Sequence, residues 1–275
     1  MKRLWCLLLL CALLIPSAGA EGVLQVHQMM LGCADGYLIR TPGGVNVLID
    51  GGRDTGDEPE RVLDYLRALG VERIDVHILS HYHMDHAGNV REINAAFGTP
   101  ESVVYGPSET LPEEYSPLTT GAYRRMQMGD RLQIDGVELL CVGPETMKKQ
   151  GWDNVDSLNV LLTVGERRML FTGDYMPAEV IKIYREELRN VDVLKFPHHG
   201  MRPLCMPDWA ISHVNAKFIL IPGAVRMHVN NKTFDLHQHP KIYANGDGHV
   251  VVLTDGDRLE VRTQVPHAEA LALGL

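Results

Sequence analysis

The spacing of hydrophobic residues varies along the chain. Some segments have the period that is typical of strands, and others have the period that is typical of helices. Residues 24–30 alternate between apolar and polar, and residues 37–40 and 45–50 are apolar runs on either side of the turn TPGG. This pattern predicts a first half that opens with antiparallel hairpins.

Residues 57–70 carry apolar side chains at helical spacing and end at Gly70, which predicts a helix with Asp57 and Glu60 as a capping box. Strands and helices continue to alternate beyond it. Strands are predicted at 76–80, 137–143, 158–165, 167–174, 192–196, 218–223 and 249–255, and helices at 177–190 and 207–216. This order fits two sheets with helices on their outer faces.

The first twenty residues do not follow this pattern. Lys2 and Arg3 precede an apolar run, Pro16 closes the run, and small residues lead to Ala20. The segment predicts a signal peptide at 1–20 that is cleaved after Ala20, because the run is too short for a membrane anchor. We expect residues 21–275 to form one domain that is secreted to the extracellular space or the periplasm, with no stable membrane association after cleavage.

The net charge argues against one class of partner, nucleic acid, and the cysteines bear on whether the fold has disulfides. The chain has 26 Lys+Arg and 35 Asp+Glu, and without residues 1–20 the formal net charge becomes −11. Such a chain has no broad attraction for nucleic acid. Beyond the signal peptide Cys33, Cys141 and Cys205 remain, and we expect them to be buried apolar residues rather than a disulfide framework.

The stretch SHYHMDHAGN, residues 80–89, gathers metal-ligand side chains directly after the predicted strand 76–80. His81 and His83 flank Tyr82 and can reach one point, whereas Asp85 and His86 lie further round the loop and face a second point. Imidazole and carboxylate groups at this spacing favour two adjacent metal ions over a histidine-rich surface loop.

Two later strand ends supply further candidates. FTGD ends with Gly173, which permits a tight turn, and Asp174, whose carboxylate could bridge two cations. KFPHHG ends with His198 and His199. Each fragment is weak alone, but all three follow predicted strands, so we expect them to meet at one edge of the fold.

The order HxHxDH, TGD and a strand-terminal His resembles the metallo-β-lactamase superfamily. The stretches LGCADGYLIRTPGGVNVLIDGG, VERIDVHILSHYHMDHAGN, DSLNVLLTVGERRMLFTGD and VDVLKFPHHG look most like the C-terminal hydrolase domain of the ComEC competence proteins and their free-standing relatives. The resemblance implies an α/β fold, an αββα four-layer sandwich, with the site between the loop edges of its two sheets.

The resemblance also implies a ligand set for two divalent metal ions. Zinc is the expected ion, with manganese or iron as alternatives. His81 and His83 would bind the first ion, Asp85, His86 and His198 the second, and Asp174 would bridge them. Asp50 in LIDGG would hydrogen-bond into the metal loop, or be a plain turn residue.

The chain departs from the superfamily's pattern in two places. No His occurs from Ala87 to Gly173, and PHHGM lacks the Ser that often follows HHG in the ComEC-like branch. We therefore expect Asp153 or Asp156 of WDNVDS as the extra ligand of the first ion, or a site with a single ion. His228, His237 and His239 lie where that branch often has a His-Pro pair, and each is equally consistent with a polar loop.

The function that this resemblance implies is a hydrolase that uses a metal-bound hydroxide on small or short phosphodiesters or phosphate esters. Asp85 would steer the remaining proton of the nucleophile, and His199 would contact the oxyanion or protonate the leaving group, or would only support a ligand. The alternatives are hydrolysis of a β-lactam, lactone or thioester, and a catalytically degenerate metal-binding protein of the same fold.

Overall fold

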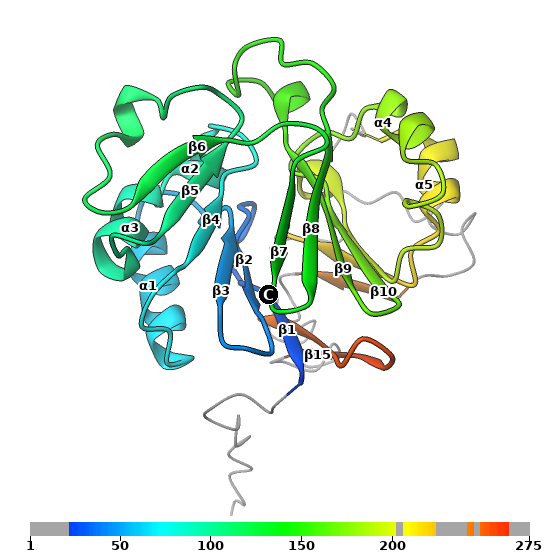
Figure 1. Cartoon of the computed structure of the whole chain (residues 1–275), viewed down its shortest axis with the longest axis horizontal. Helices are drawn as coiled ribbons and strands as arrows, with labels where there is room; N and C mark the ends of the chain where they lie inside the picture. The colour runs from blue at the N-terminus through cyan, green and yellow to red at the C-terminus, as the bar shows by residue number, and fades with distance from the viewer. Residues whose placement is uncertain (1–21, 202–205, 224–240, 245–247, 264–275) are drawn as a thin grey trace, which may run out of the picture.

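Two β-sheets face each other, and helices cover the outer face of each one (Figure 1). The computed structural model describes residues 22–201, 206–223, 241–244 and 248–263. The predicted signal peptide at 1–20, Cys205 and the histidines at 228, 237 and 239 lie outside these residues. The predicted αββα sandwich is confirmed.

The first sheet holds the N-terminal strands and closes with two strands from near the C-terminus. Its order is β15 (Leu259–Thr263), β14 (Val250–Thr254), β1 (Leu24–Gln28), β2 (Tyr37–Arg40), β3 (Asn46–Ile49), β4 (Val76–Ile78), β5 (Val103–Gly106) and β6 (Ala122–Arg125). Strands β3 to β6 are parallel to one another, and the remaining pairs are antiparallel.

The second sheet holds the later strands. Its order is β13 (Lys241–Ala244), β12 (Phe218–Ile221), β11 (Val193–Lys195), β10 (Arg167–Phe171), β9 (Asn159–Val164), β8 (Val137–Gly143) and β7 (Arg131–Ile134). Strands β10 to β13 are parallel, and the strands from β7 to β10 pair antiparallel. Each sheet therefore has a parallel half, whose strands end at one common edge.

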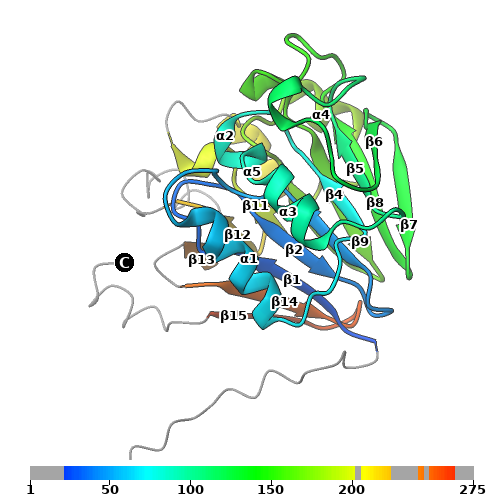
Figure 2. The same cartoon turned by 90° about the vertical axis from the view of Figure 1, so that its left-hand side faces the viewer.

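Helices α1 and α3 lie over the first sheet, and α4 and α5 lie over the second (Figures 1 and 2). The helices are α1 (Glu58–Ala68), α2 (Met84–Ala87), α3 (Val90–Phe97), α4 (Ala178–Ile183) and α5 (Asp208–Val214), with single 3-10 turns η1 (Glu113–Tyr115), η2 (Asn154–Asp156) and η3 (Pro197–Gly200). None of the helices in the described residues is long and apolar enough to cross a bilayer.

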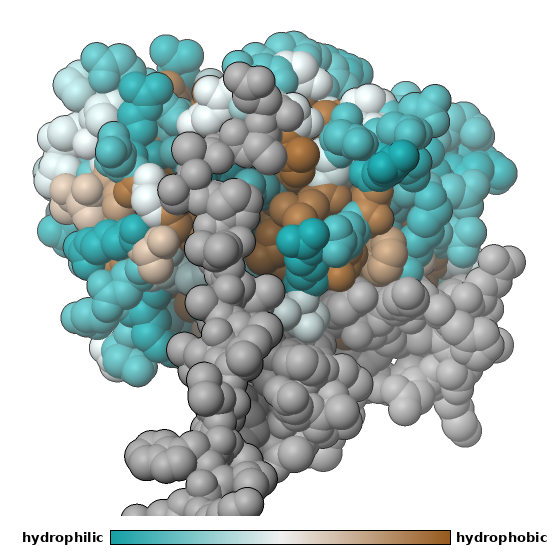
Figure 3. Space-filling model, turned by 90° about the horizontal axis from the view of Figure 1, so that it is seen from below, coloured by the Kyte–Doolittle hydropathy of each residue, from teal (hydrophilic) through white to brown (hydrophobic). Residues whose placement is uncertain are grey.

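The largest apolar core lies between the two sheets. Val26 and Ile39 of the first sheet and Leu162 and Phe171 of the second belong to it, and all four are buried. The ring of Tyr37 meets the ring of Phe171 edge-on with centroids 5.4 Å apart, which joins the sheets by aromatic contact. Seen from below, apolar residues gather near the middle of the face among hydrophilic ones (Figure 3).

Separate cores lie under each helical layer. Val62 and Leu66 of α1 pack with Leu38 and Leu48 of the first sheet, as the helical spacing predicted. A second cluster joins α4 and α5 to the outer face of the other sheet. These layers fix both sheets, so the loops at the shared strand edge start from rigid positions.

Two local predictions were wrong. Asp57 makes no side-chain cap hydrogen bond, because its carboxylate instead faces Arg61 Nε at 3.5 Å. The helix predicted at 177–190 ends at Ile183. Beyond it the guanidinium of Arg168 donates to the carbonyl oxygens of residues 186, 187 and 189, which holds this segment in turns.

Candidate metal centre

The HxHxDH segment follows the carboxyl end of β4 and is tied to the neighbouring loops through its backbone. The N–H of Gly51 donates to the carbonyl of His86 at 2.8 Å, and the N–H of Asp35 donates to the carbonyl of Asp85 at 3.0 Å. These two bonds join the loops that follow β1, β3 and β4. The metal-ligand side chains therefore stand on a hydrogen-bonded base rather than on a loose loop.

Tyr82 explains why its two neighbours face the same way. Its ring is fully buried, and its hydroxyl lies 2.6 Å from the hydroxyl of Tyr123 and 2.5 Å from Ser108 Oγ. Because successive residues of an extended segment point to opposite sides, His81 and His83 share the other side, with ring centroids 4.7 Å apart.

Asp50 fixes both the loop and one imidazole, which confirms its expected hydrogen bond into the loop. Its carboxylate accepts from the backbone N–H of Ser80 at 2.7 Å, from the Ser80 hydroxyl at 2.8 Å, and from Nδ1 of His86 at 2.8 Å. Because Nδ1 faces Asp50, Nε2 is the atom of His86 that can bind a metal, and it turns towards Asp174.

Asp174 follows β10 and stands between the two sheets. Gly173 before it has a φ of 53°, and an added Cβ would lie 2.7 Å from the Cβ of Ser157 and 3.1 Å from that of Ser80. Only glycine allows this close approach of the two sheets. The Ser157 hydroxyl then accepts the backbone N–H of Asp174 at 2.9 Å, which holds the carboxylate in place.

The two oxygens of the Asp174 carboxylate face different histidines. Oδ1 lies 3.1 Å from Nε2 of His86 and 3.6 Å from Nε2 of His199. Oδ2 lies 3.8 Å from Nε2 of His81 and 4.0 Å from Nε2 of His198. One carboxylate thus divides the site into two halves.

The PHHG turn after β11 holds two consecutive residues in the left-handed region. His198 and His199 both have a φ of 52°, a conformation that is costly for residues with a Cβ and that occurs most often at functional sites. The turn directs His199 inward, so that its Nε2 lies 3.3 Å from Asp85 Oδ2 and its Nδ1 lies 3.4 Å from Asp35 Oδ1.

Asp35 and Lys195 form a buried ion pair behind these histidines. The ammonium of Lys195 contacts the Asp35 carboxylate and donates to the carbonyl of Gly173, and both side chains are 1% exposed. Asp35 Oδ2 also lies 3.4 Å from Nδ1 of His86. Asp35 therefore faces the Nδ1 atoms of both His86 and His199, and Lys195 balances its charge.

The charges set the protonation of the buried groups. Burial lowers the pKa of His86, but the carboxylates of Asp174, Asp35 and Asp50 outweigh burial and raise it well above its ordinary value. Burial acts on Asp174 in the opposite sense, yet His86, His199 and Lys195 hold its pKa well below the usual range. For His81, burial together with the nearby His86 lowers the pKa, so this imidazole is neutral and able to bind a metal.

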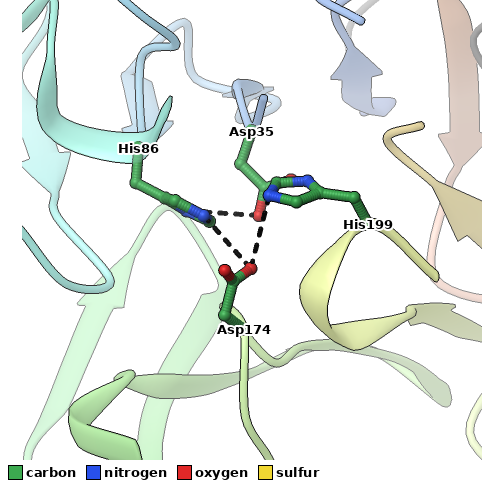
Figure 4. Close-up of side chains that lie close together, drawn as sticks. All are labelled: Asp35, His86, Asp174 and His199. Atoms are coloured by element: carbon green, nitrogen blue, oxygen red, sulfur yellow. Dashed lines mark ion pairs between the residues drawn. The ribbon is translucent and has the colours of Figure 1, made fainter. Parts of the chain in front are cut away.

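Two groups of side chains can each hold a cation. Figure 4 shows the first group, in which His86 and His199 converge on Asp174 with Asp35 behind them. The second group is His81, His83 and Asp174. Several buried atoms of these groups have no hydrogen-bond partner, namely Nε2 of His81, His86 and His199, and Oδ1 of Asp174. Buried polar atoms without a hydrogen bond are costly, and a cation between them would remove this cost, so the donor set fits metal ions.

The structure brings the candidates of the HxHxDH, TGD and PHHG segments together, with one difference in their expected arrangement. His199 belongs to the first group, whereas His198 lies beside Oδ2 of Asp174, on the side of His81. Asp85 Oδ1 lies 4.0 Å from Nε2 of His86, at the margin of the first group.

The expected extra ligand of the first ion was wrong for Asp156. Its carboxylate accepts the backbone N–H groups of Lys148, Lys149 and Gly151 and shapes the loop before β9. Asp153 pairs with Lys149 at 2.6 Å. Neither carboxylate belongs to a metal-holding group among the described residues.

Sequence reasoning did not single out Lys195 or Arg53, and it gave Asp35 no role in the site. Lys195 had a signal, because a lysine inside the apolar run DVLKF needs a buried partner. Arg53 lies directly after LIDGG, and its Nη2 is 3.4 Å from Asp85 Oδ2. The expectation that the cysteines are buried is confirmed for Cys141 and wrong for Cys33, which is partly exposed.

Comparison with known proteins confirms the resemblance. The profile of the Metallo-beta-lactamase superfamily matches residues 34–201, more than half of the chain, so the chain belongs to this superfamily. It is a metal-dependent hydrolase of that class, with His and Asp groups that can hold a metal.

Individual relatives are distant. ComE operon protein 3 of Bacillus subtilis is 24% identical over 223 residues, which are 72% of this chain but only 28% of that protein. The metallo-beta-lactamase fold protein YhfI of Bacillus subtilis matches with a TM-score of 0.58 at 17% identity, over 87% of this chain and all of that one. A protein of Parabacteroides distasonis matches with a TM-score of 0.50 at 13% identity, over 80% of this chain and 92% of that one.

Proposed function

We propose that this chain hydrolyses phosphodiesters or related phosphate esters with the help of two divalent metal ions that share Asp174. One observation carries the proposal. The two oxygens of a single buried carboxylate face two separate sets of imidazole nitrogens, and these nitrogens include buried atoms without partners. A carboxylate between two imidazole sets is the arrangement that two neighbouring cations need.

We assign the ligands by the atoms that face one another. His81 and His83 with Oδ2 of Asp174 would hold the first ion, and His86, Asp85 and Oδ1 of Asp174 the second. His199 takes the remaining place at the second ion, because its Nε2 points at both Asp85 and Asp174. His198 then stands beside the first ion, because its Nε2 lies 4.0 Å from Oδ2 of Asp174.

Two such ions, when bound, lower the pKa of a shared water towards neutrality and stabilise negative charge on the attacked phosphoryl group. The chain's own residues prepare this chemistry. Asp50 and Asp35 hold the Nδ1 side of the imidazoles, which directs each Nε2 inward. Asp85 is 21% exposed, so its carboxylate can orient a water that enters from solvent and steer its proton.

The donor types support a choice of metal ion. Both groups combine imidazole nitrogen with carboxylate oxygen, which suits zinc, with manganese or iron as alternatives. We further propose that the mature chain is exported and acts on small or short substrates. Residues 1–20 and the net negative charge support these two points.

The deciding experiment measures turnover of bis(p-nitrophenyl) phosphate and of nitrocefin by the same protein, loaded with zinc and with manganese in turn. We expect turnover of the phosphodiester, and turnover of nitrocefin alone would contradict the phosphate assignment.

Asp174→Ala should remove both ions and lower turnover by about 1,000-fold or more, since several kcal/mol of transition-state stabilisation are lost.

Asp64→Ala is the matched control for Asp174→Ala. This carboxylate lies on α1, is 74% exposed and pairs only with Arg67 among the described residues. It should leave metal content and turnover unchanged. Full metal content and activity in Asp174→Ala would overturn the two-ion proposal.

A further inference from the structure

The site has a buried floor and a partly exposed rim. The side chains of His86 and His199 are not exposed, and Asp174 is 2% exposed. By contrast, the side chains of His198 and Arg53 are 22% and 30% exposed. Asp85, His198 and Arg53 therefore form the partly exposed rim of the site.

The backbone that carries Arg53 is fixed to the site. The N–H of Gly52 donates to the carbonyl of Asp35 at 2.8 Å, and the N–H of Arg53 donates to Glu58 Oε1 at 2.6 Å. Gly52 has a φ of 76°, and an added Cβ would lie 2.6 Å from the same Glu58 oxygen. Glu58, buried at the start of α1, thus holds the turn that presents Arg53.

Among the described residues, hydrogen bonds to the guanidinium of Arg53 involve one nitrogen, Nη2. Nη2 donates to the carbonyl of Cys33 at 2.5 Å and lies 3.4 Å from Asp85 Oδ2. Within the described part of the chain, Nε and Nη1 make no hydrogen bond. They remain as donors on a planar group that is always charged and whose fork fits two phosphate oxygens.

The other permanent cation in contact with the site is not available to substrate. Lys195 is 1% exposed, and its ammonium is already taken by Asp35 and the carbonyl of Gly173. Among the described residues that contact the metal-holding side chains, Arg53 therefore supplies the one accessible permanent positive charge.

We propose that Arg53 binds a phosphoryl oxygen of the substrate and thereby makes the site prefer anionic phosphate esters to neutral esters. This inference rests on the proposed function and names the residue that selects the substrate class. A different role would be simple neutralisation of Asp85, in which Arg53 would affect every substrate equally. The two roles predict different results for two substrates with the same leaving group.

The test compares Arg53→Gln and Arg53→Lys with the unchanged protein, on bis(p-nitrophenyl) phosphate and on p-nitrophenyl acetate. Arg53→Gln should lower kcat/KM for the diester by about 10- to 100-fold, the loss of one charge-assisted contact, and leave kcat/KM for the acetate unchanged. Arg53→Lys should restore part of the loss, because the charge returns without the fork.

Binding without turnover gives a second readout. Inorganic phosphate, titrated by calorimetry into metal-loaded protein, should bind more weakly to Arg53→Gln by a similar factor, while mass spectrometry finds the metal content unchanged. Arg67→Gln is the control, because Arg67 lies on α1 with its side chain 57% exposed and pairs with Asp64 rather than with the site. It should change neither readout.

Three results would overturn the inference. These are a loss of metal from Arg53→Gln, an equal fall of its kcat/KM for both esters, and full diester turnover together with full phosphate affinity. Failure of the proposed function looks different, because the unchanged protein would then cleave acetate or nitrocefin but not the diester. If the unchanged protein cleaves no ester, phosphate affinity alone decides the role of Arg53.

Discussion

Two sets of buried histidines in this molecule have pKa values shifted in opposite directions. At the strand edge, burial lowers the pKa of His199, but Asp35 and Asp85 raise it to about 9. Inside the first sheet, burial lowers the pKa of both His27 and His77 to about 4, and no carboxylate side chain offsets it. Burial is nearly the same in the two sets, so neighbouring carboxylates decide the charge of each imidazole.

His27 differs from the strand-edge set in how its polar atoms are used, whereas Nε2 of His77 lacks a hydrogen-bond partner, as Nε2 of His86 does. His27 in β1 places Nδ1 2.9 Å from the hydroxyl of Tyr65 and Nε2 3.2 Å from Gln25 Oε1, so both nitrogens have partners. In the strand-edge set, Nε2 of His86 and both nitrogens of His199 lack hydrogen-bond partners. The first arrangement stabilises a fold, whereas the second gives up stability to keep ligand atoms available.

The largest expected effect separates His199 from His198. His199→Ala should remove the second ion and lower diester turnover by about 1,000-fold, because a buried ligand facing Asp85 and Asp174 is lost. His198→Ala should lower it less, since this residue is partly exposed and lies 4.0 Å from Asp174. Turnover and metal content of the two variants give the comparison.

His249→Gln serves as a control outside both sets of histidines. His249 stacks on Tyr65 with ring centroids 3.7 Å apart, away from the metal groups. It should keep both ions. A greater loss of metal from His198→Ala than from His199→Ala would reverse our assignment of the two residues.

An intermediate effect is expected from Asp35→Asn. The amide keeps the shape of the side chain but not the charge that faces Nδ1 of His86 and His199 and pairs with Lys195. Loss of a carboxylate behind ligating histidines costs about 10- to 100-fold in metal affinity. Competition with a chromophoric chelator measures this affinity.

Asp135→Asn is the matched control for Asp35→Asn. Asp135 also accepts a hydrogen bond, from the hydroxyl of Thr41 at 2.7 Å, but it contacts no histidine among the described residues. Metal affinity should stay unchanged in this variant. Equal metal affinity in Asp35→Asn and the unchanged protein would show that Asp35 only balances the charge of Lys195.

The sequence predicted the strand edge because its signals are local. An apolar run ending at Ser80, FTGD and KFPHHG each show a strand followed by metal-ligand residues, and parallel strands bring such ends to one edge. The resemblance to the superfamily then predicted the arrangement of sheets and helices in four layers. These parts of the fold and site depend on patterns within a few residues of one another.

The parts that sequence did not predict depend on contacts between distant segments. Asp35 enters the site because its backbone N–H bonds to the loop of Asp85, and Arg53 because the same loop lies beside it. The choice between His198 and His199 depends on two left-handed residues that no periodicity indicates. Arg168 ends α4 early by binding carbonyls that lie beyond it along the chain.

The smallest effect concerns the structural set and the stability of the metal-free protein. A buried histidine whose folded pKa is about 4 binds its proton more readily in the unfolded chain, where the pKa is about 6.5. Stability is therefore full above pH 6.5 and falls as pH drops towards 4, with a slope of up to about 1.4 kcal/mol per pH unit for each such residue. Because His27 is 3% exposed, it should contribute close to this full slope.

Urea unfolding in chelator at pH 7, 6 and 5 should show a shallower loss of stability for His27→Gln than for the unchanged protein. Equal slopes in the two proteins would mean that His27 is charged when folded, and the contrast between the two sets of histidines would fail.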